Sequence, residues 1–209
     1  MGKTADPGPS NPPRAWQRML SGRRLDLLDP SPLDIEIADI ALGLARVARW
    51  NGQTVGSHAF SVAQHVLLVE ALLREASPGM ERRWLLAALL HDAPEYVIGD
   101  LISPFKTALG LDYKAFEVRL LEAIHLRFAL PRRLPEPIVA EIKAADRSAA
   151  YWEATRLAGF SPAEAEAYFG SPGKTGPALT ADLESLLVPW PTAEAEAKYL
   201  SRFEALGGS

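Results

Sequence analysis

Apolar residues recur at helical spacing along most of this chain, and that period limits it to helical folds. The pattern is clear from Leu33 onward, where the apolar positions are Ile37, Ile40, Ala41, Leu44 and Val47. Alternating apolar and polar runs are missing from the sequence, and β-branched residues do not cluster, so strands are not expected. We therefore predict an all-α fold.

The periodic segments predict the positions of the helices. They lie at about 34–50, 57–75, 81–91, 112–129, 135–158, 161–169 and 192–206. Asp34 is placed to cap the first helix, Pro94 closes the third, and Gly207 follows the last. Short loops are expected between them.

The composition along the chain predicts one domain with an extension at each end. Residues 1–13 are rich in proline and lack the apolar surface that ordering requires, so we expect a disordered tail within an N-terminal extension over 1–32. Residues 33–170 would form the domain. Residues 171–209 would form a Gly- and Pro-rich linker and a helix that packs on it. A hydrophobic content of 48% in 209 residues is sufficient for one core.

The charge of the chain excludes some partners. A net charge of −4 argues against a nucleic acid polymer as partner, because such binding needs a concentrated basic face. A small anionic ligand stays compatible, since a pocket needs only a few cations.

No apolar run reaches about 18 residues, so we expect no membrane span and a cytoplasmic protein. The absence of cysteine leaves histidine and carboxylate side chains as metal ligands.

The segment from His91 to Glu95, with the sequence HDAPE, carries the strongest chemical signal. It follows a helix end at 85–90 that is almost wholly apolar and therefore buried. The His91 imidazole and the Asp92 carboxylate then lie in the protein interior, where unpaired polar groups are costly. His91 and Asp92 could instead cap a helix or pair with a cation. Glu95 makes the cluster denser, and dense clusters of acids and imidazoles beside apolar runs typically bind an ion or carry out proton chemistry.

A metal ion would need further ligands from other segments. His58 and His65 are separated by about 10 Å along a helix axis, so one ion cannot bind both. We assign His58, at the start of the predicted helix, to the metal. We interpret His65 as a core histidine or one that supports a ligand. His125 is interpreted as structural or exposed.

Asp146 is the remaining candidate ligand. It lies in a helix interior among alanines, where aspartate has poor helix propensity and needs a partner. That partner could be Lys143 or Arg147 rather than an ion. Two histidines and two aspartates would give a divalent ion nitrogen and oxygen ligands and leave room for water.

Taken together, these residues resemble the HD-domain phosphohydrolases, in particular the small 5′-deoxynucleotidases. The resemblance covers about residues 39–152 and is carried by SHAFSVAQH (57–65), HDAPEYVIGDLISPFK (91–106) and AADRSAAY (144–151). It implies a single-domain HD helical bundle. It also implies one divalent ion per chain, of the Mn, Co, Fe, Ni, Zn or Mg kind, held by His58, His91, Asp92 and Asp146.

The resemblance implies roles for five other residues. Glu95 would act on the attacking water, and Asp100 would be a catalytic or sugar-contacting group. Arg49 and Trp50 would meet the nucleotide, and Lys106 would offset the charge on its phosphate.

The expected function is metal-dependent hydrolysis of nucleotide phosphate esters, with nucleoside or deoxynucleoside 5′-monophosphates as the main substrates. Two alternatives stay open, namely release of triphosphate from deoxynucleoside triphosphates and a non-catalytic nucleotide-sensing HD module. A helical scaffold with an incidental His-Asp pair is disfavoured by the combined spacing of the three segments. The expected partner is a small nucleotide, and related proteins suggest a homodimer.

Overall fold

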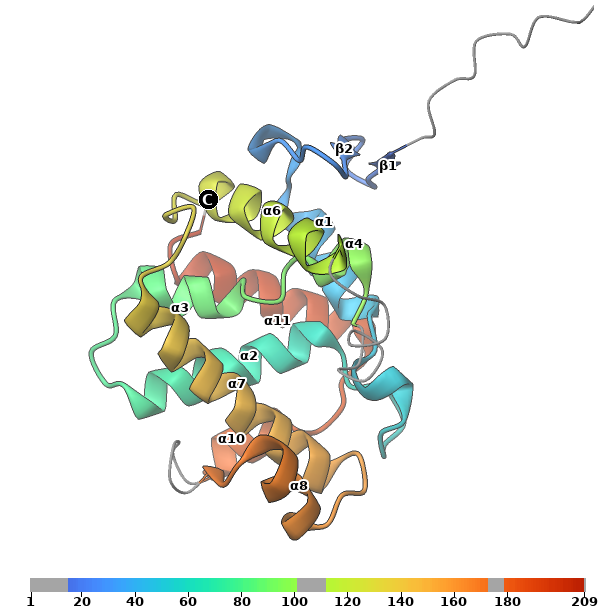
Figure 1. Ribbon diagram of the computed structural model, residues 1–209. Coiled ribbons are helices and arrows are strands. Elements are labelled where there is room, and N and C mark those ends of the chain that lie inside the picture. The colour runs from blue at the N-terminus through green and yellow to red at the C-terminus, as the bar shows by residue number, and fades with distance from the viewer. Residues whose placement is uncertain (1–14, 101–111, 173–178, 209) are drawn as a thin grey trace, which may run out of the picture.

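The computed structural model describes residues 15–100, 112–172 and 179–208 of the chain, and most of them are helical (Figure 1). The α-helices are α1 (Ile37–Arg46), α2 (Val62–Ala76), α3 (Arg82–Leu89), α4 (Glu95–Ile98), α6 (Asp112–Arg127), α7 (Glu136–Arg156), α8 (Pro162–Phe169), α10 (Ala181–Ser185) and α11 (Thr192–Ala205). Two short 3-10 helices, η1 (Pro32–Asp34) and η2 (Arg49–Gly52), lie on either side of α1. The predicted all-α fold is confirmed.

A small hairpin in the N-terminal extension departs from the helical expectation. Strands β1 (Trp16–Arg18) and β2 (Arg24–Asp26) pair antiparallel, with Gln17 opposite Leu25. Leu25 is buried, and the turn of the hairpin is fastened to α1 where the Ser21 amide donates to Asp39 at 3.0 Å. The prediction that no strand forms was wrong here, because three-residue strands are too short to show alternation.

Helix α2 lies at the centre of the bundle. Every residue from Val62 to Leu73 is buried, and α2 packs against α1, α3, α7, α10 and α11. A helix that is covered on all sides is normally apolar all round. Three polar side chains interrupt this apolar surface, namely Gln64, His65 and Glu70. Each of them therefore needs a partner inside the protein.

Gln64 and Glu70 bind the C-terminal part of the chain. The Gln64 amide nitrogen donates to the carbonyl oxygens of Leu186 and Val188 at 2.8 and 2.6 Å, and its oxygen accepts from the Trp190 amide at 3.1 Å. The Arg202 guanidinium forms two bonds with the Glu70 carboxylate, at 2.6 and 2.9 Å. Helix α11 thereby lies along α1 and α2, as Figure 1 shows, and completes the bundle.

Helices α1 and α4 meet at a position where only glycine fits. A β-carbon placed on Gly43 would lie 2.7 Å from the Tyr96 β-carbon and 3.0 Å from the Tyr96 carbonyl oxygen. The two backbones are therefore in direct contact. This contact sets the position of α4, whose first residue is Glu95.

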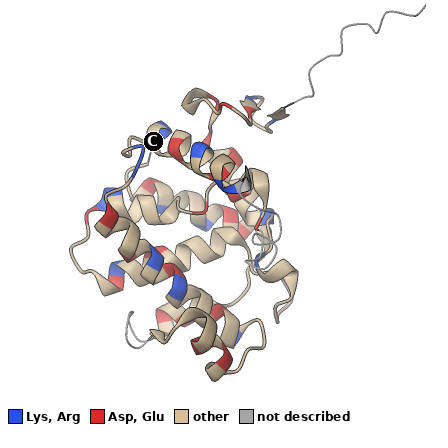
Figure 2. Ribbon diagram, in the orientation of Figure 1, with Lys and Arg blue, Asp and Glu red and all other residues tan. Residues whose placement is uncertain are grey.

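Charged residues of both signs are interspersed along the helices in the view of Figure 2. Within the described ranges, none of the helices combines the length and the apolar character that crossing a membrane would require.

Candidate metal centre

Helix α2 begins at Val62, five residues later than the sequence pattern predicted, and this displacement decides which histidine reaches the interior. Ser61 is the N-cap, and its hydroxyl accepts from the Gln64 amide. His65 therefore lies in the first turns of α2 and is completely buried. His58 precedes the cap in an exposed segment.

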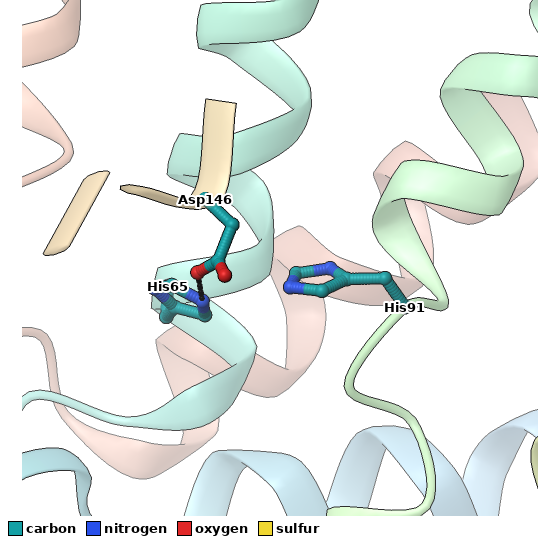
Figure 3. Close-up of side chains that lie close together, drawn as sticks. All are labelled: His65, His91 and Asp146. Atoms are coloured by element: carbon teal, nitrogen blue, oxygen red, sulfur yellow. Dashed lines mark ion pairs between the residues drawn. The ribbon is translucent and has the colours of Figure 1, made fainter. Parts of the chain in front are cut away.

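Four side chains from three segments of the chain meet here, and His65 is one of them. Its Nε2 atom lies 3.3 Å from Oδ1 of Asp146 on α7 and 3.4 Å from Oδ2 of Asp92. Nε2 of His91 lies 3.3 Å from the same Asp92 oxygen. Figure 3 shows His65, His91 and Asp146 pointing toward one another, and one ligand atom from each lies within 4.8 Å of the others.

The turn between α3 and α4 places His91 and Asp92. Helix α3 ends at Leu89, and the ring nitrogen Nδ1 of His91 donates to the Ala88 carbonyl at 2.7 Å. Because a carbonyl oxygen can only accept, Nδ1 must carry a proton. In the neutral imidazole, Nε2 then presents its lone pair to the group.

In His65, as in His91, Nδ1 is bonded to an oxygen while Nε2 faces the group, but the acceptor is a carboxylate. Its Nδ1 lies 2.5 Å from Oε1 of Glu153, on α7. The Nε2 atoms of His65 and His91 are both buried, and neither forms a hydrogen bond within the part of the chain that the structure describes. Buried polar nitrogens are almost always bonded, so two of them facing two carboxylates fit a cation between them.

The group is open to solvent on its carboxylate side. The side chain of Asp146 is 39% exposed and that of Asp92 is 21% exposed, whereas that of His65 is 0% exposed. A ligand could therefore approach past the carboxylates while the imidazoles stay fixed in the core.

The local charges also favour a cation. Burial and Arg49 lower the pKa of His65, but Glu153, Asp146 and Asp92 outweigh them and raise this pKa well above its usual value. Burial raises the pKa of Asp92, but His91 and His65 hold it well below its usual value. The carboxylates thus stay charged and draw protons onto the histidines. A divalent ion would replace those protons, since metal binding competes with protonation of its ligands.

A second network adjoins the group through Glu153. Oε2 of Glu153 accepts from the Trp50 indole nitrogen at 2.9 Å and lies 3.2 Å from Nη2 of Arg49. Nη1 of Arg49 lies 3.7 Å from Oδ2 of Asp100. Trp50 and Asn51 have φ angles of 56° and 50°, in the left-handed region that non-glycine residues seldom occupy.

The sequence was compared with known proteins. No family model matches it. An uncharacterized protein of Rhodobacter capsulatus is 58% identical over 193 residues, which make up 92% of this chain and 96% of that protein. The chain belongs to the same family as this protein.

The structure brings together three of the four predicted ligands, and in place of the fourth, His58, it has His65. His91, Asp92 and Asp146 lie together as the sequence suggested, but the histidine beside them is His65. The geometry therefore favours the opposite choice to the one made from sequence. His58 was selected because the helix was expected to begin near Ser57, whereas it begins after Ser61.

The other predicted residues fall around the group or outside the described residues. Glu95 is buried at the start of α4. Asp100 and Trp50 lie beside Arg49 and Glu153, respectively. Lys106 lies outside the described residues. The sequence reasoning missed Glu153, although its spacing of two helical turns from Asp146 would have placed both carboxylates on one face of a helix.

Proposed function

We propose that the chain is a divalent-metal-dependent phosphohydrolase acting on nucleotides, with nucleoside or deoxynucleoside 5′-monophosphates as its main substrates. The observation that carries the proposal is the pair of buried Nε2 atoms of His65 and His91, which face Asp92 and Asp146 without a hydrogen bond. Two nitrogen and two oxygen donors suit Mn, Fe, Co, Ni or Zn. An ion bound there would supply a Lewis acid and lower the pKa of water.

The protein's own residues would supply the other requirements of phosphoester hydrolysis. Glu95 follows Asp92 by three residues and is buried at the start of α4, where its carboxylate would take a proton from the attacking water. The Arg49 guanidinium is held on two sides by Glu153 and Asp100 and would offset negative charge on a phosphate. The resemblance of the HDAPE and AADRSAAY segments to the HD-domain phosphohydrolases supports a nucleotide as the substrate.

Elemental analysis and product analysis test the proposal together. Protein purified without chelator should contain about one divalent ion per chain, as the four donors of one site require. It should release inorganic phosphate from nucleoside 5′-monophosphates, and a chelator should stop this release until metal is restored. Absence of both bound metal and turnover after reconstitution with Mn, Co, Fe, Ni or Zn would overturn the proposal.

Two other outcomes of the same assay would redirect it. Release of tripolyphosphate from deoxynucleoside triphosphates would indicate a triphosphohydrolase. Saturable nucleotide binding with bound metal and no product would indicate a sensing module instead of an enzyme.

A further inference from the structure

The most deeply buried carboxylate of the two networks is that of Glu153. Its side chain is completely buried, and α7 places it two turns after Asp146. Burial of a charged group is costly unless its oxygens are fully bonded. In Glu153, each oxygen has its own partners, and these belong to different parts of the site.

We propose that Glu153 is a positioning residue that holds both halves of the site: Oε1 orients His65 toward the ion, and Oε2 fixes Arg49 and Trp50 on the substrate side. The inference rests on the proposed function, because it concerns how the same site is held. Nothing in the sequence motifs assigns a role to this residue.

The contact at Oε1 determines which nitrogen of His65 can bind an ion. A carboxylate cannot donate, so Nδ1 of His65 carries the proton that lies between the two side chains. Nε2 is then the nitrogen that can give its lone pair to an ion, and it faces Asp146 and Asp92. A carboxylate partner also makes the imidazole a stronger electron donor, and loss of such a partner typically weakens metal binding.

The contacts at Oε2 hold a backbone segment in an unfavourable conformation. Trp50 and Asn51 are left-handed, and such residues persist only where the surrounding structure fixes them. The Trp50 indole nitrogen donates to Oε2, while the Trp50 ring packs against Phe160 and Phe169 with centroids 5.7 and 5.9 Å away. The adjacent Arg49 contacts the same oxygen, so its guanidinium is fixed relative to His65 by one carboxylate.

Glu153 could have a simpler role, which is only to balance the charge of Arg49. That role would not require its contact with His65. The two roles differ in what they predict for metal binding. If Glu153 only balances Arg49, its replacement leaves the affinity for an ion unchanged. If it positions His65, the affinity falls.

The test compares Co²⁺ binding by the metal-free wild-type chain with Co²⁺ binding by two Glu→Gln variants. Binding is measured by titration with Co²⁺, monitored by absorption. Glu153→Gln should weaken Co²⁺ binding about 10- to 100-fold. Glu141→Gln is the matched control, because Glu141 is on the same helix but accepts from Ser77 at the far end of α2, at 2.7 Å. The control should bind Co²⁺ as the wild type does. With the site saturated with Co²⁺, Glu153→Gln should also show a loss of inorganic phosphate binding.

A measurement on the wild-type chain covers the case in which Glu153→Gln does not fold. In the zinc-loaded protein with ¹⁵N-labelled histidine, NMR should show His65 with a proton on Nδ1 and a metal-shifted Nε2. Equal Co²⁺ affinity of wild type and Glu153→Gln would overturn the inference, and so would a zinc-bound His65 without a proton on Nδ1. A wild-type chain that binds neither Co²⁺ nor Zn²⁺ would overturn the proposed function itself.

Discussion

At the level of single residues, the two histidines on either side of Ser61 offer the most direct test of the metal centre. His65 lies with the carboxylates, whereas His58 is exposed. His65→Ala should reduce bound metal from about one ion per chain to near zero, because the remaining donors no longer complete the site. His58→Ala should keep its metal. Elemental analysis after gel filtration checks both, and the reverse result would restore the choice made from sequence.

Glu95 separates catalysis from binding. Glu95→Gln keeps the size of the side chain but removes its basic oxygen, so hydrolysis of a 5′-monophosphate should fall about 10²- to 10⁴-fold. Bound metal should stay at the wild-type level. Steady-state kinetics and elemental analysis on one preparation measure both quantities. Normal turnover with full metal content would mean that another group takes the proton, and Asp100 would be the next candidate.

The sequence singled out His91 and Asp92 because they follow a buried apolar helix, and Asp146 because aspartate fits poorly among alanines in a helix interior. It assigned His58 rather than His65 to this group, since the helix was expected to begin near Ser57 and not after Ser61. The Ser-x-x-Gln spacing of Ser61 and Gln64 is the signal that would have shifted the helix start by one turn. The spacing of Glu153 from Asp146 was the one signal for this residue, because its partner His65 is 88 residues away in the sequence and only the folded chain joins them.

At the level of elements, the contact between α1 and α4 makes an unusual prediction about Gly43. In a helix interior, Gly→Ala normally stabilises the protein by about 1 kcal/mol. Here the added methyl group would overlap Tyr96, so Gly43→Ala should destabilise the fold by roughly 1–3 kcal/mol. It should also lower turnover, because α4 carries Glu95. Urea unfolding measures the sign of the change in the free energy of unfolding. A variant more stable than the wild type would contradict the close contact.

The length of an element decided how well the sequence predicted it. Helices α7 and α8 were expected at 135–158 and 161–169 and begin and end within two residues of these limits, since Pro135 and Ser161 mark their starts. The hairpin and α10 were missed. Their segments of three and five residues are too short to establish a period, and their stability comes from burial of Leu25 and Leu183 against distant elements.

At the level of the whole molecule, the origin of the donors links metal binding to stability. His65 comes from α2, His91 from the turn after α3, and Asp146 from α7, so the group exists only in the folded chain. An ion at 100 times its dissociation constant should stabilise the fold by about 2.7 kcal/mol. For a chain of this size, that corresponds to a rise in Tm of roughly 5–10 °C.

Thermal unfolding with and without Co²⁺ measures this shift. His65→Ala is the control and should show none of the rise. An equal rise in the variant would mean that the ion stabilises the protein from some other place.

The packing of α11 on α1 and α2 has a consequence for the order of events on the ribosome. Translation delivers α1 and α2 early, but Tyr199 and Phe203, which cover them, arrive with the last helix described. Until α11 is made, the nascent polypeptide carries exposed apolar faces on α1 and α2, the condition in which chains aggregate or engage chaperones. Closure of the core over α1 and α2 therefore waits until α11 has been synthesised and can pack on them.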